Sequence, residues 1–120
     1  MSDIEKWKKD VGPGWSFILD LTDNALEQWI PGYKIRQIKE KFGGLRYYFD
    51  FPDNFDDDYD LEDPATENEY SVRKQSIWDF VHAMESLAST VCDQCGKPGQ
   101  MRTSGPYNNY VLCDEHKDGG

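Results

Sequence analysis

The sequence predicts an α+β fold: two main helices pack on a small antiparallel β-hairpin, and a compact unit rich in Cys and His follows. Three observations support this prediction: two stretches with apolar residues at helical spacing, a strand-like run after a glycine pair, and two close Cys/His pairs near the C-terminus. A chain of 120 residues has the size of one domain. We expect an α+β core at 1–91, with an acidic insert at 52–69, and a finger at 92–120 docked on that core.

The first helices are predicted from periodicity and from helix breakers. Residues 3–10 suit a short helix that ends before Gly12-Pro13-Gly14. A longer helix then reaches Pro31-Gly32, because apolar residues recur near a 3.6-residue period. Its predicted core stripe comprises Trp15, Ile18, Leu19, Ala25, Leu26, Trp29 and Ile30.

A β-hairpin is predicted at 33–51. Leu45, Tyr47, Phe49 and Phe51 alternate with polar or outward residues, as in a half-buried strand. Gly43-Gly44 supplies the positive φ that tight primed turns require. The two isoleucines at 35 and 38 differ in parity, so we expect a bulge or a late start in the first strand.

The second main helix is expected after a turn-rich loop at 52–63. Asp63-Pro64 suits a helix start, and Thr66 with Glu69 suits a capping box. An apolar stripe then continues for about 25 residues. Its members are Tyr70, Ile77, Phe80, Val81, Met84, Leu87, Ala88 and Val91.

Four residues near the C-terminus have the spacing of a metal site. Cys92, Cys95, Cys113 and His116 follow the pattern C-x₂-C-x₁₇-C-x₂-H, which uses every cysteine of the chain. Thiolate and imidazole donors in two close pairs are typical of structural Zn²⁺, and four protein ligands leave no position for water or substrate. An iron–sulfur cluster is the alternative metal group.

The residues around the four ligands predict a treble-clef order. Gly96 permits a zinc knuckle, and turn signals at Pro98-Gly99 and Ser104-Gly105-Pro106 fold the spacer into a hairpin. Asp114 and Glu115 suit the start of a last helical turn that carries His116.

Three blocks of the chain carry a resemblance to known proteins. QIKEKFGGLRYY at 37–48, CDQCGKPG at 92–99 and LCDEH at 112–116 resemble a group of small, mostly uncharacterised bacterial and phage proteins. Those proteins have a KFG-x-LR hairpin motif upstream of a Cys/His zinc motif. The resemblance covers about a third of the chain and implies a zinc-binding protein of bacterial or phage origin. It implies no reaction.

The net charge of −10 has a local source. Ten acids and no base lie between Asp50 and Glu69, whereas the rest of the chain is balanced. One interpretation is a solvated loop. A second is a calcium loop, but Leu61 stands where that loop needs glycine and a strand precedes it; its ligands would be Asp56, Asp58, Asp60, Glu62 and Glu67.

The third interpretation of the acidic segment is an interaction surface. Carboxylates interleaved with aromatic residues resemble the charge of a nucleic-acid backbone, so such a surface could bind the basic groove of a DNA- or RNA-binding protein. The candidate partner-binding residues are Asp53, Asp56, Asp57, Asp58, Tyr59, Asp60, Glu62 and Asp63.

The predicted hairpin is the basic element of the chain. Its candidate phosphate contacts are Lys34, Arg36, Lys39, Lys41 and Arg46, against a single acid, Glu40. The other interpretation, which we favour, is that these bases pair with the acidic segment or flank the strands. Tyr47 and Tyr48 could stack on bases.

The function predicted from the sequence is therefore non-enzymatic. The chain lacks the common catalytic motifs, and His82 is the only histidine outside the metal set. We expect an interaction protein, in the form of a phage- or prophage-encoded inhibitor that binds a host protein with a basic surface. The alternatives are a zinc-finger protein that binds nucleic acid through the hairpin, and a purely structural or metal-storing protein.

The sequence also predicts where the protein acts. It has no apolar leader and no run near the roughly 20 apolar residues that a membrane span needs. With an odd number of cysteines, this favours the cytoplasm and argues against a membrane partner.

Overall fold

The computed structural model describes residues 3–57, 59–103 and 109–117, and it has the predicted α+β architecture. Predictions at Asp58 and at Ser104-Gly105-Pro106 lie outside the described residues. The elements are α1 (Ile4–Trp7), η1 (Lys8–Asp10), η2 (Pro13–Trp15), α2 (Ser16–Trp29), β1 (Lys34–Lys41), β2 (Gly44–Asp50), α3 (Pro64–Ala88), β3 (Gln100–Thr103) and β4 (Asn109–Leu112). Strands β1 and β2 form one antiparallel sheet, and β3 and β4 form another.

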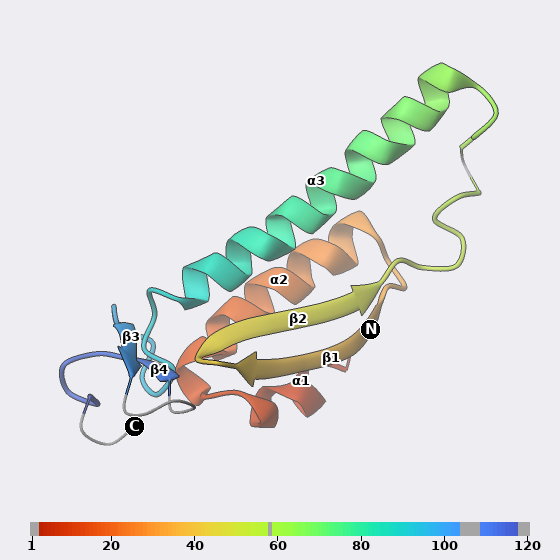
Figure 1. Cartoon of the computed structure of the whole chain (residues 1–120). Coiled ribbons are helices and arrows are strands. Elements are labelled where there is room, and N and C mark those ends of the chain that lie inside the picture. The colour runs from red at the N-terminus through yellow and green to blue at the C-terminus, as the bar shows by residue number, and fades with distance from the viewer. Residues whose placement is uncertain (1–2, 58, 104–108, 118–120) are drawn as a thin grey trace.

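The molecule is elongated, with extents of 56 × 26 × 22 Å. Figure 1 shows α2 and α3 running alongside the β1–β2 hairpin. The β3–β4 hairpin lies at one end, and the loop that leads into α3 lies at the other end. The Cys/His unit and the acidic loop are therefore far apart.

Helix α2 buries the predicted stripe on the inner side of the molecule. Ile18, Leu19 and Leu26 are fully buried, as is Trp15 at the end of η2 just before the helix. Trp29 was predicted to lie in the core, but its side chain is 42% exposed. Its ring meets the edge of Phe80 on α3 at 4.9 Å between centroids, so the indole covers the rim of the helix pair and keeps one side in water.

The β1–β2 hairpin confirms the alternation and the predicted bulge, which lies between Ile35 and Gln37. The predicted turn at Gly43-Gly44 is wrong by one residue: Phe42 (φ 54°) and Gly43 (φ 84°) form the turn, and Gly44 begins β2. The strands pair Ile38 with Tyr47 and Ile35 with Phe49. The packing of these inward side chains fixes the register and therefore which two residues form the turn.

Helix α3 begins where the sequence predicts, after Asp63. The Asp63 carboxylate accepts hydrogen bonds from the Ala65 backbone N–H at 3.1 Å and from the Thr66 hydroxyl at 3.3 Å, and Pro64 occupies the first turn. The predicted capping box at Thr66 and Glu69 is therefore wrong, because Thr66 already lies inside the helix. None of the helices in the described ranges has the length and apolar character that crossing a membrane would require.

A polar cluster lies inside the core between α2 and the hairpin. The Tyr33 hydroxyl donates to the Asp23 carboxylate at 2.5 Å and lies 2.6 Å from the Tyr47 hydroxyl. The Glu85 carboxylate accepts the backbone N–H of Tyr47 at 2.7 Å. Burial raises the pKa of the hydroxyl groups of Tyr33 and Tyr47, and the hydrogen bond to Asp23 raises that of Tyr33 further. Both hydroxyls therefore stay neutral and can donate hydrogen bonds.

Candidate metal centre

The structure brings the four predicted ligands together. Cys92 follows α3, Cys95 lies in the turn after it, and Cys113 and His116 follow β4. The three sulfur atoms and one ring nitrogen all lie within 4.8 Å of one another. His116 turns Nδ1 toward the sulfurs, at 3.3 Å from Cys113 and 3.7 Å from Cys92, and the sulfurs of Cys95 and Cys113 are 3.7 Å apart.

These separations can be compared with the edges of a metal tetrahedron. Bonds of about 2.3 Å to sulfur and about 2.0–2.1 Å to nitrogen give edges of about 3.8 Å between sulfurs and about 3.6 Å between sulfur and nitrogen. Three of the six distances, at 3.3 to 3.7 Å, lie close to these values. The cluster can therefore hold one tetrahedral metal ion with little movement.

The two cysteines of the first pair differ in their tendency to ionise. A hydrogen bond from the Lys97 backbone N–H lowers the pKa of the Cys95 thiol, but burial and the neighbouring Cys113 and Cys92 side chains raise it, and the net shift is upward. The backbone around Cys92, in contrast, favours its thiolate. Burial opposes ionisation of Cys92, but hydrogen bonds from the backbone N–H groups of Cys113, Gln94 and Cys95 outweigh it and lower the pKa of the Cys92 thiol to about 6. This is the knuckle arrangement that Gly96, with φ 81°, permits.

In the second ligand pair, the Cys113 thiol resembles that of Cys92. Burial opposes ionisation of Cys113, yet the His116 side chain and neighbouring donors lower the pKa of its thiol. The same contact raises the pKa of His116. The thiolates of Cys92 and Cys113 and the His116 imidazolium therefore stabilise one another, and positive charge is favoured between them. A divalent cation supplies that charge and leaves His116 neutral as a ligand.

The last ligand lies on a turn. The order of knuckle, β3–β4 hairpin and final ligand turn follows the treble-clef prediction. At 114–117 the chain forms hydrogen-bonded turns, with the His116 N–H donating to the Cys113 carbonyl at 3.1 Å, where the sequence suggested one helical turn. Ion pairs of Lys97 with Glu115 at 3.3 Å and of Arg102 with Asp114 at 3.0 Å tie this turn to the knuckle and to β3.

The N-terminal segment holds the knuckle against the core. The Gly14 N–H donates to the Asp93 carbonyl at 2.8 Å, and the Trp15 indole N–H donates to the Val91 carbonyl at 2.8 Å. A Cβ on Gly14 would lie 2.1 Å from the Cys92 carbonyl oxygen. From the sequence, Gly12-Pro13-Gly14 was interpreted only as a helix breaker, and its contact with the knuckle was missed. The second glycine, Gly14, was the available signal, because a residue without a side chain permits close approach of another backbone.

The aromatic residues of the acidic segment pack against α3, whereas most of its acidic residues are exposed. Phe55 is 8% exposed, and its ring lies 5.4 Å from that of Tyr70. The Tyr70 hydroxyl donates to the Asp56 carboxylate at 2.8 Å, and Arg73 donates to the Tyr59 hydroxyl at 2.8 Å. The carboxyl-bearing residues Asp53, Asp57, Asp60 and Glu62 are exposed, while Asp63 caps α3.

The basic residues of the hairpin gather on its outer face. Lys39 pairs across the strands with Arg46, and its ammonium lies 5.8 Å from the Tyr48 ring. Lys34, Arg36 and Lys41 are exposed. Among the residues that the structure describes, one of the pairings expected with the acidic segment forms, between Arg36 and Asp50 at 3.6 Å. Tyr47 was a candidate for stacking on bases, but it is buried and cannot do so.

The fold and the cluster define a small α+β protein with a C-terminal Cys₃His cluster that could hold a metal ion. Comparisons with protein-family models, with curated proteins and with solved structures found no match. The resemblance to small bacterial and phage zinc proteins, drawn from three short blocks of sequence, stays a prediction.

Proposed function

We propose that this chain is a non-enzymatic zinc-binding interaction protein whose acidic loop binds a protein with a basic surface. One observation supports this proposal most. Phe55, Tyr59 and Tyr70 anchor the loop to α3, so its exposed carboxylates are held in place before any partner arrives. A preorganised surface loses less conformational entropy on binding than a free loop does.

Zinc is the metal that the donors favour. Three thiolates and one imidazole in tetrahedral spacing suit Zn²⁺, and four protein ligands make the site structural. The ion would hold the knuckle and the ligand turn together, and it would supply no chemistry to a substrate. In a phage or prophage setting, binding of the acidic surface would inhibit a host protein that normally contacts nucleic acid.

Elemental analysis tests the metal assignment. We expect one zinc per chain in protein purified without added metal, and loss of that zinc in Cys95→Ser and His116→Ala. His82→Ala is the matched control because His82 is an exposed helix residue, and it should keep full zinc content. Iron with inorganic sulfide, or zinc that survives His116→Ala, would contradict the proposal.

A basic peptide tests the acidic surface. We expect the labelled peptide Lys-Arg-Lys-Ala-Lys-Arg-Lys to bind at low salt, and Asp53→Asn/Asp57→Asn/Glu62→Gln to weaken it about threefold to tenfold in fluorescence anisotropy. Asp3→Asn/Asp10→Asn/Asp79→Asn removes the same three charges outside the loop and should have a smaller effect. Equal losses in the two variants would show that net charge, and no defined surface, attracts the peptide.

A second candidate function is nucleic-acid binding through the outer face of the hairpin. Lys39 beside the half-exposed Tyr48 ring, and Lys41 at 5.9 Å from the exposed Phe42 ring, combine positive charge with surfaces for stacking. Binding of labelled single-stranded DNA, weakened by added salt and by Lys39→Ala/Lys41→Ala, would favour this candidate.

A further inference from the structure

A β-bulge in β1 decides which side chains the hairpin presents on its outer face. Ile35 pairs with Phe49 across the strands. The next pair is Gln37 with Tyr48, so Arg36 is an extra residue without a cross-strand partner. Two residues of β1 then oppose one residue of β2, and the alternation of inward and outward side chains shifts by one position. Both Arg36 and Gln37 are therefore exposed.

The bulge gathers the cations of β1 on one face. In a regular strand, residues with even numbers and residues with odd numbers point to opposite faces. The cations of β1 include both kinds, so in a regular strand half of them would point at the core. In the structure none of them is buried, whereas Ile38, which follows the bulge, is 1% exposed. With one residue of β2 they form a basic face: Lys34, Arg36, Lys39, Lys41 and Arg46.

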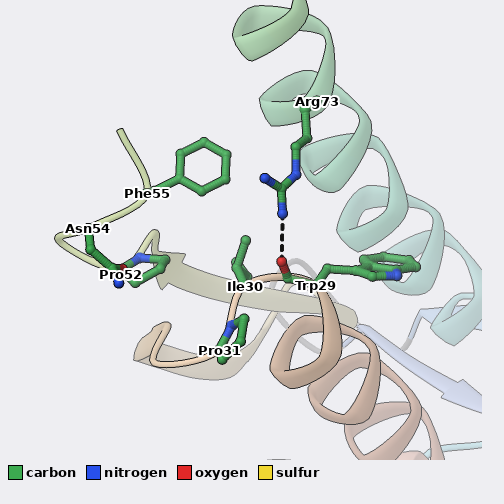
Figure 2. A pocket seen from close by; sticks show the side chains of 7 residues that line it. All are labelled: Trp29, Ile30, Pro31, Pro52, Asn54, Phe55 and Arg73. Carbon is green, nitrogen blue, oxygen red and sulfur yellow. Dashed lines mark hydrogen bonds between the residues drawn. The ribbon is translucent and has the colours of Figure 1, made fainter. Parts of the chain in front are cut away.

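The cations of the basic face are available to a ligand. Arg36 lies 3.6 Å from the Asp50 carboxylate, and among the described residues this is the one ion pair of the face. The cation at the middle of α3 differs. Figure 2 shows Arg73 closing a pocket between the acidic loop and the end of α2, where it donates to the Trp29 carbonyl at 2.8 Å. The basic face can therefore bind anions while breaking at most one exposed ion pair.

A hollow of about 260 Å³ lies at the bulge and is lined by Arg36, Gln37 and Tyr48. Its chemistry is mixed, because it combines a guanidinium, an amide that donates and accepts hydrogen bonds, and a ring that is 37% exposed. The Lys39 ammonium lies 5.8 Å from the centre of that ring. A nucleotide complements each group: the face of its base suits the ring, the edge of its base suits the amide, and its phosphate suits the cations.

The length of the basic face favours a strand over a single nucleotide. From Lys34 to Lys41 the face extends about 20 Å, at about 3.3 Å per residue. At the tip of the hairpin the Phe42 ring is 59% exposed, and the Lys41 ammonium lies 5.9 Å from its centre. Exposed rings with adjacent cations along an extended surface are the elements of a stacking platform for single-stranded nucleic acid. The bases of a duplex are stacked on one another and offer no free faces for such contacts.

We infer that the bulge forms a nucleotide subsite, in which one base of a single strand stacks on Tyr48 while the adjacent phosphate binds Arg36. The inference rests on the second candidate function, and it names the residues and the form of nucleic acid that this function would use. The net charge of −10 repels a polyanion from the rest of the surface, so the contacts are confined to the basic face.

Substitution of the Tyr48 ring tests the stacking contact. We expect a labelled oligothymidylate of about twelve nucleotides to bind the wild-type chain at low salt in fluorescence anisotropy. Tyr48→Thr should weaken this binding about tenfold, because the stacking of one base is lost. Tyr48→Phe keeps the ring and should bind like the wild type, and circular dichroism checks that both variants are folded. Equal binding by Tyr48→Thr and the wild type would overturn the inference.

A strand without bases provides the matched ligand control. An abasic strand of the same length has the same backbone charge and no base to stack, so the wild-type chain should bind it about tenfold more weakly than oligothymidylate. Tyr48→Thr should bind the two strands about equally, because the same contact has already been removed. If the wild-type chain binds both strands equally, phosphates alone are recognised and the inference is overturned.

The dependence of affinity on salt tests the phosphate contact. Each phosphate contact with a single strand contributes about 0.7 to the slope of log affinity against log salt. Arg36→Gln should reduce the slope by about this amount. Lys9→Gln removes one exposed positive charge outside the hairpin and should leave the slope unchanged. Equal reductions in the two variants would show that net charge alone attracts the strand, and would overturn the inference.

NMR of the wild-type chain checks the location without any variant. Oligothymidylate should shift the side-chain amide of Gln37, in the hollow, more than that of Gln75 on α3. A larger shift at Gln75 would place the strand elsewhere and overturn the inference.

The outcomes separate the inference from the function on which it rests. If Lys39→Ala/Lys41→Ala weakens the binding of oligothymidylate while Arg36→Gln and Tyr48→Thr have no effect, nucleic-acid binding stands and the subsite is overturned. If no strand binds at low salt, the second candidate function fails and the inference fails with it. The proposal for the acidic loop is independent of both results, since a basic peptide tests it.

Discussion

At the scale of single residues, the buried cluster of Asp23, Tyr33 and Tyr47 is the least expected feature. A carboxylate that is 7% exposed is costly unless it is hydrogen-bonded, and here the Tyr33 hydroxyl provides that bond. The three residues join α2 to both segments of the hairpin. They therefore specify how the helix and the sheet align as well as stabilising the contact.

Tyr33→Phe should destabilise the protein by about 1–3 kcal/mol, because it removes one hydroxyl and leaves the Asp23 carboxylate without that donor. Tyr48→Phe is the matched control on the outer face of the same hairpin, where the ring is 37% exposed, and it should change stability by less than about 0.5 kcal/mol. Urea denaturation followed by circular dichroism measures both. Equal effects would show that the cluster contributes little.

At the scale of elements, the start of α3 links the acidic loop to the helix. Asp63 ends the loop and caps the helix, and the carboxylate lies at the positive end of the helix dipole. Pro64 in the first turn needs no N–H partner. The loop is thus attached to α3 at two places, by the packing of Phe55 and Tyr59 against Tyr70 and by the cap at Asp63.

Asp63→Ala should cost about 1 kcal/mol, because the first turn of α3 loses its capping acceptor. Thr66→Ala should cost less, since Thr66 lies within the helix and its hydroxyl makes one long bond to Asp63. Thermal unfolding of both variants compares the two caps directly. A larger loss for Thr66→Ala would restore the capping box that the sequence suggested.

At the scale of the whole molecule, the Cys₃His unit is joined to the core through hydrogen bonds to its backbone carbonyls. The Gly14 N–H and the Trp15 indole reach carbonyls on either side of Cys92, and a Cβ on Gly43 at the hairpin tip would lie 2.6 Å from the Met101 sulfur. Metal binding should therefore stabilise the docking of the finger as well as its internal structure.

Gly14→Ala should lower zinc affinity and stability together, because the new Cβ overlaps the backbone oxygen of Cys92 and the knuckle must shift. We expect a loss of about 1–3 kcal/mol in unfolding free energy, measured by thermal unfolding in the presence of zinc, and weaker zinc retention against a competing chelator. Gly44→Ala is the control: its Cβ would meet the flexible end of Arg46 at 3.0 Å, which can move aside. Unchanged zinc retention in Gly14→Ala would contradict this coupling.

Much of the fold was predictable because local patterns agreed with the final packing. The stripe at Trp15, Ile18 and Leu19, the bulge near Ile35 and the helix start at Asp63-Pro64 depend on neighbours in the sequence. The four ligands were predictable for the same reason, since two short spacings limit which side chains can meet at one ion.

The sequence by itself determined the fold class, the order of the main elements and which four Cys/His residues come together, because periodicity, glycine pairs and the spacing of Cys and His are local properties. Tertiary structure alone decided the turn at Phe42-Gly43, the exposure of Trp29 and the partner of Asp23. It also decided that Arg73 would join the acidic loop to the end of α2 and form a pocket there. Each of these depends on side chains that meet across long stretches of chain, which no local pattern records.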